Sequence, residues 1–212
     1  MVMNKTIIDY CMDLSGAADP ILEQIERETQ LQVLMPRMVS GRYQGQVLTF
    51  LSNLIRPTLI VEIGSFTGYS ALCLVKGLKA GGRLITIEKN PELETRLIKN
   101  FNLASQANKI QLIIGPAKSK IPLLPDEIDL VFIDADKENN DVYFDLLLPK
   151  MRSGGLMIVD NVLWSGKVVE KDVQTDKATQ AIDTFNRKVG SDQRVRQLFL
   201  PIRDGLLLIQ KI

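Results

Sequence analysis

A chain of 212 residues with 45% hydrophobic and 24% charged side chains has the composition of one globular domain with a sizeable core. Its 26 basic and 25 acidic side chains give a net charge of +1, which provides no strong field to attract nucleic acid or a membrane. Histidine is absent, which excludes serine–histidine hydrolysis, cysteine–histidine proteolysis and HExxH zinc chemistry. Any chemistry must therefore use carboxylates, lysine, amides, the backbone or a bound metal.

Targeting and redox signals favour a cytoplasmic protein. The N-terminal segment lacks the apolar core and cleavage site of a signal peptide, and no apolar run is long enough to cross a bilayer. Cys11 and Cys73 lie far apart and form no CxxC pair. We expect both to be buried thiols in a reducing compartment.

The first 54 residues read as a helical cap on a core formed by residues 55–212. Asp19 is placed to cap a helix that starts at Pro20, because aspartate is favoured at the N-cap and proline at the first helical position. Residues 44–54 carry apolar side chains at helical spacing and predict a second helix. We treat the whole chain, residues 1–212, as a single domain.

The core alternates between short apolar strands and helices, which predicts an α/β fold with a mostly parallel, doubly wound, Rossmann-like sheet. The last two apolar runs are joined by Arg203, Asp204 and Gly205 with no helix between, so we expect a hairpin and one antiparallel edge strand. Seven strands are expected, at residues 58–63, 83–88, 110–114, 128–133, 155–159, 195–202 and 206–212. Helices are expected at residues 69–78, 91–104, 118–124, 142–151 and 179–189.

A glycine loop follows the first strand. Gly64 and Gly68 allow a tight turn and a close approach of the backbone to a ligand. Their GxxxG spacing differs from the GxGxxG of dinucleotide folds, which argues against an NAD-dependent oxidoreductase. Glu88 ends the second strand, where a carboxylate can accept both hydroxyls of a ribose. The alternative is a plain turn with a solvated glutamate, but Glu62 and Glu88 together favour a ligand site.

Oxygen-bearing side chains follow two later strands. Asp134 ends the fourth strand, and Asp160 and Asn161 end the fifth, so the three meet at the carboxyl edge of the sheet. Two carboxylates and an amide are hard ligands suited to Mg²⁺, and an incomplete protein shell leaves room for substrate oxygens. Lys137 is a candidate base, because a nearby cation would lower the pKa of its ammonium. The alternatives are acidic decoration of strand ends and a solvated lysine.

At these residues the chain resembles the class I cation-dependent O-methyltransferases, the caffeoyl-CoA and catechol O-methyltransferase family and its bacterial branch. The resemblance is carried by VEIGSFTGYSAL, RLITIEKNP, GPA at 115–117, DLVFIDADKENN, GGLMIVDNVLWSGKVV and LPIRDGLLLI, in order along most of the chain. The pairing of FIDADK with DNVLWSG is the most specific of these matches.

The resemblance implies S-adenosylmethionine as cofactor and Mg²⁺, or another divalent ion such as Mn²⁺ or Ca²⁺, as metal. Cofactor residues by position are Ser40, Glu62, Gly64, Ser65, Ser70, Glu88, Ala117, Asp134 and Asp136. Metal ligands are Asp134, Asp160 and Asn161, and Lys137 is the catalytic base. Substrate contacts are Asp134, Lys137, Asn161 and Ser165. One departure is the stretch from Ser40 to Gln44, where the family often has Pro-Glu or Ala-Asp before Gln/Glu-Gly.

We therefore expect methyl transfer to one hydroxyl of a catechol-like small molecule. Alternatives within the fold are methylation of a hydroxylated uridine in tRNA, disfavoured by the near-neutral charge, and a non-catalytic cofactor-binding protein, disfavoured by the intact polar residues. We expect no nucleic-acid or membrane partner. The apolar N-terminal helices, with Met35 and Met38, predict a homodimer, and the loop at residues 162–174 is expected to shape the acceptor pocket.

Overall fold

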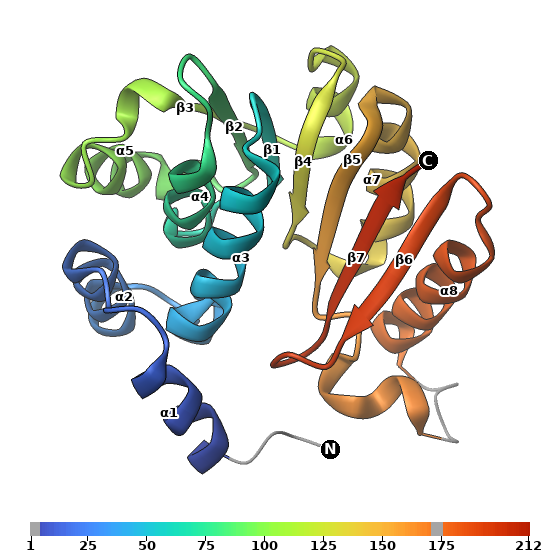
Figure 1. Cartoon of the computed structure of the whole chain (residues 1–212), viewed down its shortest axis with the longest axis horizontal. Coiled ribbons are helices and arrows are strands. Elements are labelled where there is room, and N and C mark those ends of the chain that lie inside the picture. The colour runs from blue at the N-terminus through green and yellow to red at the C-terminus, as the bar shows by residue number, and fades with distance from the viewer. Residues whose placement is uncertain (1–4, 171–175) are drawn as a thin grey trace.

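A seven-stranded sheet forms the centre of the protein in the computed structural model, which describes residues 5–170 and 176–212 (Figure 1). Its strand order is β3-β2-β1-β4-β5-β7-β6, and the five strands from β1 to β5 are parallel. The strands are β1 (Leu59–Ile63), β2 (Arg83–Glu88), β3 (Ile110–Ile114), β4 (Ile128–Ile133), β5 (Met151–Asp160), β6 (Val195–Leu200) and β7 (Leu206–Lys211). The mostly parallel α/β fold expected from the sequence is confirmed.

Helices cover both faces of this sheet. They are α1 (Lys5–Leu14), α2 (Pro20–Gln32), α3 (Gly41–Ile55), α4 (Tyr69–Leu74), α5 (Glu94–Leu103), α6 (Ala117–Lys120), α7 (Asn140–Leu147) and α8 (Lys177–Ser191). Along β1 the side chains alternate between two cores, as the pleat of a strand requires. Val61 packs with residues of α6, α7 and α8, whereas Ile60 packs with residues of α2, α3, α4 and α5.

The C-terminal hairpin is confirmed, but its order in the sheet differs from the expectation. Strand β7 pairs antiparallel with both β5 and β6, so the antiparallel strand is second from the edge. Strand β6 forms the edge and runs in the same direction as β1–β5. The sequence identified the hairpin correctly but did not indicate which of its strands inserts beside β5.

Helices α2 and α3 pack on one face of the sheet beside α4, whereas α1 extends away from the sheet (Figure 1). Asp19 caps α2 as expected, accepting hydrogen bonds from the backbone of Ile21 at 2.9 Å and Leu22 at 3.4 Å. Ile25 of α2 and Leu48 of α3 are fully buried, which fixes both helices against the core. No helix within the described residues is long and apolar enough to span a membrane.

Several predicted boundaries shift at prolines and glycines. The helix expected at residues 142–151 ends at Leu147, and a 3-10 turn from Leu148 to Lys150 contains Pro149. Met151 therefore begins β5, four residues before the expected start of that strand, and pairs with Ile128 across a register shift. Cys73 is buried as expected, but Cys11 is only half-buried.

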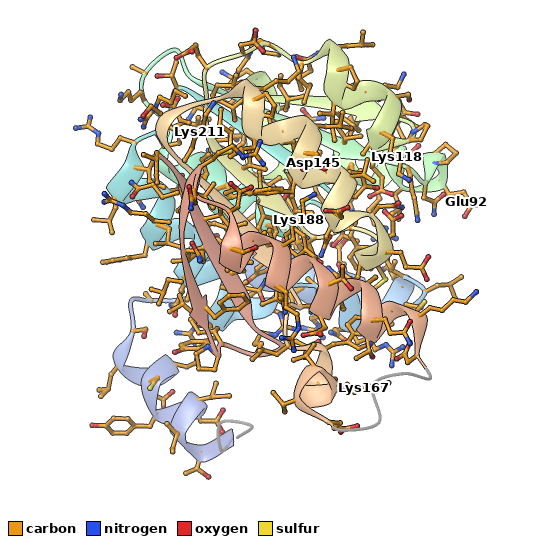
Figure 2. The ribbon with its side chains drawn as sticks, turned by 90° about the vertical axis from the view of Figure 1, so that its right-hand side faces the viewer. Glu92, Lys118, Asp145, Lys167, Lys188 and Lys211 are labelled. Atoms are coloured by element: carbon orange, nitrogen blue, oxygen red, sulfur yellow. The ribbon has the colours of Figure 1, made fainter. Side chains whose placement is uncertain are left out.

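Helices α7 and α8 lie side by side on one face of the sheet, and ion pairs connect them at the protein surface. Lys188 of α8 forms ion pairs with Asp141 and, at 2.8 Å, with Asp145 of α7 (Figure 2). Phe144 and Phe185 pack edge-to-face beneath them, with ring centroids 6.1 Å apart. Residues of α7 and α8 pack in the same core as residues of β4 and β5. The carboxyl ends of these two strands carry polar residues.

Candidate active site

The candidate site lies where the order of the strands reverses. Strand β1 is flanked by β2 and β4, and the chain leaves β1 for α4 on one face and leaves β4 for α7 on the other. In open α/β sheets, ligands bind at the carboxyl ends of the strands beside such a switch point. The predicted polar residues follow β1, β2, β4 and β5 at this edge.

The glycine loop packs directly against the end of β4. Gly64 has φ +94°, and a Cβ at this position would lie 2.1 Å from the backbone oxygen of Asp134. Gly68 has φ +82°, and its Cβ would lie 2.6 Å from the Phe101 ring. Only glycine fits both the backbone conformation and the space at these positions. The loop after β1 is therefore held against the residue that follows β4.

A buried carboxylate supports this loop from below. Glu62 is fully buried and accepts hydrogen bonds from Ser70 at 2.6 Å and from Thr86 at 2.5 Å. Ser65 shares a hydrogen bond with Thr86, which extends the network into the loop. Burial, together with the charges of Asp134 and Glu88, raises the pKa of Glu62 to about 7, although the two hydroxyl donors favour its ionised form.

Glu88 lies at the end of β2 and is 7% exposed. One oxygen of its carboxylate accepts from the backbone N–H of Phe66 at 2.9 Å and of Ser65 at 3.2 Å. The other oxygen accepts from the N–H of Asn90 at 2.8 Å. Glu88 therefore joins the glycine loop to the turn after β2.

A narrow pocket opens above this network. Five of the predicted residues line it, and they come from the end of β4, the glycine loop, α4 and the segment before α3. Its lining residues are Met38, Val39, Ser40, Gly64, Ser65, Phe66, Thr67, Tyr69, Ser70 and Asp134. The structure therefore brings Ser40 together with the glycine loop.

The metal-ligating candidates each already hold a polar partner. Asp134 accepts from the ammonium of Lys137 at 2.8 Å, and the Lys137 side chain is 10% exposed. Asp160 is 4% exposed and accepts from the side-chain amide of Gln44 at 2.6 Å. Burial raises the pKa of Asp160, the charge of Asp134 raises it as well, and the charge of Lys137 opposes both. These charges act on one another, so Asp134, Lys137 and Asp160 face a shared space.

The loop after β5 is held in an uncommon backbone conformation. Asn161 has φ +61° and Ser165 has φ +56°, both in the left-handed region. The side-chain amide of Asn161 donates to Asp204 at 3.5 Å, and the backbone N–H of Ser165 also donates to Asp204. Ser165 itself is exposed. Of the expected pocket loop at 162–174, residues 171–174 lie outside the described residues.

Two predicted cofactor residues have other contacts in the structure. The Asp136 carboxylate accepts from the hydroxyl of Tyr143 at 2.6 Å and from the amide of Asn139. Burial alone would raise the pKa of Asp136, but these hydrogen bonds outweigh it and lower the pKa. Ala117 is buried at the first position of α6, just beyond β3. Both residues lie on the carboxyl side of the sheet but outside the lining of the narrow pocket.

Three polar residues of the site were not identified from the sequence. Thr86 is a polar residue in the otherwise apolar centre of β2, and this break in the pattern could have indicated a buried hydrogen-bonding role. Gln44 is buried in the amphipathic helix α3, where a polar residue is normally predicted to face solvent. Arg203 lies in the turn that predicts the hairpin and within the LPIRDGLLLI stretch, but neither pattern indicates its contact with Gln44 at 3.2 Å.

A doubly wound sheet with a glycine loop, two buried glutamates and an oxygen-rich strand edge defines a ligand-binding α/β protein suited to a nucleoside-containing cofactor. The sequence profile of the O-methyltransferase family matches residues 12–212, and the chain belongs to this family. It is 31% identical to a probable caffeoyl-CoA O-methyltransferase 2 of Dictyostelium discoideum, over 99% of this chain and 93% of that protein. It is 32% identical to a catechol O-methyltransferase of Niastella koreensis, over 91% of this chain and 90% of that protein.

A solved structure shows the same fold. The SAH-bound methyltransferase PaMTH1 of Podospora anserina superposes with a TM-score of 0.90 at 26% identity, covering 100% of this chain and 98% of that one. The enzyme class expected from the sequence, an O-methyltransferase, is therefore confirmed.

Proposed function

We propose that this enzyme transfers the methyl group of S-adenosylmethionine to one hydroxyl of a catechol-like small molecule, with a divalent cation such as Mg²⁺. The observation that carries the proposal is the juxtaposition, at the β1–β4 switch point, of a glutamate-supported glycine loop with Asp134 and Asp160. The names of the Dictyostelium and Niastella relatives support the acceptor class, and the SAH in PaMTH1 supports the cofactor.

On the cofactor side, the residues of this chain bind and orient. Glu88 is proposed to accept the ribose hydroxyls, because its carboxylate ends β2 beside the loop where a nucleoside would lie. Ser65 and Phe66 now donate their backbone N–H groups to Glu88, which keeps the loop close to that carboxylate. Ser40, Ser70 and Asp134 line the pocket from the other sides and are proposed to contact the rest of the cofactor.

On the acceptor side, the donor set suits a hard divalent cation. Asp134, Asp160 and Asn161 offer two carboxylates and an amide oxygen. Within residues 5–170 and 176–212, no three histidine, cysteine, aspartate or glutamate side chains cluster to hold a metal by themselves. An ion here would therefore keep positions for water and for two acceptor oxygens. When bound, the cation would lower the pKa of the attacking hydroxyl.

Lys137 is proposed to remove the proton from that hydroxyl. Its side chain is nearly buried and its ammonium is held at 2.8 Å from Asp134, and this position beside a proposed metal ligand supports the role. An ammonium cannot act as a base, so Lys137 must lose its proton and leave the ion pair before catalysis. The resulting phenolate would then attack the methyl carbon of S-adenosylmethionine in one step. The C–O bond would form as the C–S bond breaks and SAH leaves, with no covalent enzyme intermediate.

We also propose that the chain forms a homodimer. The outer face of α3 carries Phe50 and Leu54, each 66% exposed, and a groove of about 600 Å³ runs between α3 and the link from α1 to α2. Met35 and Met38, before α3, are 54% and 51% exposed. Exposed apolar area of this kind favours association. Light scattering that gave a mass near 23.8 kDa at micromolar concentration would contradict this proposal.

A methyl-transfer screen tests the function. Purified protein is incubated with S-adenosylmethionine and with vicinal diphenols, caffeoyl esters or bulk tRNA, each with and without Mg²⁺. We expect transfer to a diphenol or caffeoyl ester that stops with a chelator and returns with Mg²⁺. Transfer to tRNA alone would replace the proposed acceptor, and transfer that ignores the chelator would refute the metal.

A further inference from the structure

The turn between β6 and β7, residues 203–205, contacts both sides of the acceptor site. Arg203 has φ +51°, an uncommon conformation for a residue with a side chain, and Gly205 has φ +90°. Asp204 accepts from the backbone N–H of Ser165 and from the side-chain amide of Asn161, on the β5 side. Arg203 extends to the opposite side, toward the start of α3. One short turn therefore connects two segments that are distant in sequence.

Arg203 determines how the Gln44 amide is oriented. Its guanidinium donates to the Gln44 side-chain oxygen at 3.2 Å, to the Val39 carbonyl at 3.4 Å and to the Ser40 carbonyl. The nitrogen of the same Gln44 amide donates to Asp160 at 2.6 Å. A flipped amide would place N–H groups against the guanidinium and its oxygen against the carboxylate, so only one orientation satisfies both partners.

Gln44 and Asp160 are buried, at 1% and 4% exposure, so their hydrogen bond is shielded from water. Asp160 also accepts from the backbone N–H of Asn161 at 2.7 Å through its other oxygen. These two donors fix the rotation of the carboxylate and leave lone pairs on both oxygens. Groups that hydrogen-bond to a metal-ligating side chain set its orientation and commonly change metal affinity when removed.

We propose that Arg203, acting through Gln44, is a positioning residue that holds the Asp160 carboxylate ready to bind a divalent cation. This inference rests on the proposed function, since it gives Asp160 the role of a metal ligand. A purely structural alternative is that Arg203 only ties the hairpin to the start of α3 through the carbonyls of Val39 and Ser40. The two roles differ in what happens to Gln44 and to the metal.

Four variants separate these roles. Arg203→Met removes the guanidinium and keeps an extended apolar side chain, and Arg203→Lys keeps the charge but lacks the planar fork. Gln44→Leu removes the amide at similar volume. Arg196→Met, on the exposed face of β6 in the same hairpin, is the matched control for losing an arginine.

The first readout requires no metal. The side-chain amide signals of Gln44 are assigned in a ¹⁵N–¹H NMR spectrum by their absence in Gln44→Leu. We expect Arg203→Met to shift or split these signals, because both amide orientations become accessible, and Arg196→Met to leave them in place. Unmoved Gln44 signals in Arg203→Met would overturn the orienting role.

The second readout is the affinity for Mn²⁺ alone, measured by electron paramagnetic resonance. We expect Arg203→Met and Gln44→Leu to weaken Mn²⁺ binding by about tenfold or more, Arg203→Lys by less, and Arg196→Met not at all. In turnover assays, the metal concentration giving half activity should rise in Arg203→Met while the rate at saturating metal stays near that of the wild type.

The outcomes are distinguishable. Wild-type protein that binds no Mn²⁺ would refute the metal in the proposed function. Wild-type and Arg203→Met proteins that bind Mn²⁺ equally well would refute the positioning role alone and leave the proposed function intact. If Arg203→Met does not fold, Gln44→Leu and Arg203→Lys decide the question by the same measurement.

Discussion

Replacing Glu62 by glutamine should make the protein's stability respond differently to pH. Glu62 is fully buried, and its pKa rises from 4.5 to about 7, chiefly because burial disfavours the charged form. Between these two pH values, the folded protein holds a proton on Glu62 that the unfolded chain has already released. Raising the pH through this window therefore favours unfolding of the wild type.

The size of the effect follows from the pKa. A rise from 4.5 to about 7 corresponds to about 3 kcal/mol, at about 1.4 kcal/mol for each pKa unit. This cost is absent below pH 4.5 and complete above pH 7. Glutamine carries no proton to lose and can still hydrogen-bond to Ser70 and Thr86. The stability of Glu62→Gln relative to the wild type should therefore rise by about 3 kcal/mol across the window.

Urea unfolding of both proteins at several pH values from 4 to 8 measures this difference, because titrating groups that do not interact with Glu62 contribute equally to both proteins. Glu92→Gln is the matched control, because that side chain is exposed to water before and after unfolding (Figure 2). The free energy of unfolding of Glu92→Gln relative to the wild type should not change with pH. If the Glu62→Gln difference were equally flat, the burial argument for Glu62 would be refuted.

Three further predictions concern binding and turnover. Glu88→Ala should weaken S-adenosylmethionine binding by about 1.5–3 kcal/mol in calorimetry, because the ribose would lose a charged partner; unchanged affinity would remove Glu88 from the site. Asp160→Ala should abolish turnover but keep cofactor binding, since Asp160 lies on the acceptor side; residual metal-dependent activity would argue against its role as a ligand. Lys137→Ala should keep metal and cofactor binding but slow the chemical step by about 10²–10⁴-fold, and normal single-turnover rates would show that Lys137 is not the base.

The sheet and the strand-end residues were predictable because they are encoded locally. Each buried parallel strand is a short apolar run, and the polar residues that follow it must lie at the same edge of the sheet. Glu88, Asp134 and Asp160 were predicted to lie at this edge in this way, and Glu62 was predicted as a polar residue within the first strand. Gly64 was predicted from its place directly after the first strand. The structure supplies the reason for glycine there, since a Cβ would lie 2.1 Å from the backbone oxygen of Asp134.

What the sequence did not reveal depends on contacts between distant segments. Gln44 and Asp160 are 116 residues apart, and Arg203 contacts Ser40 from 163 residues away. No local pattern distinguishes a glutamine that supports a carboxylate from one that faces water. The position of β7 between β5 and β6 was missed for a similar reason, because a hairpin can add to a sheet by either strand.

The insertion of β7 also affects how the sheet is completed. Among the residues that the structure describes, β5 pairs on one side with β4 and on the other with β7 alone, and β6 pairs with β7 alone. Until residues 206–211 pair within the sheet, this edge of β5 is open and β6 has no strand beside it. An open edge of this kind invites pairing with other nascent chains. Strand β7 therefore closes the edge of β5 and brings β6 into the sheet in a single step.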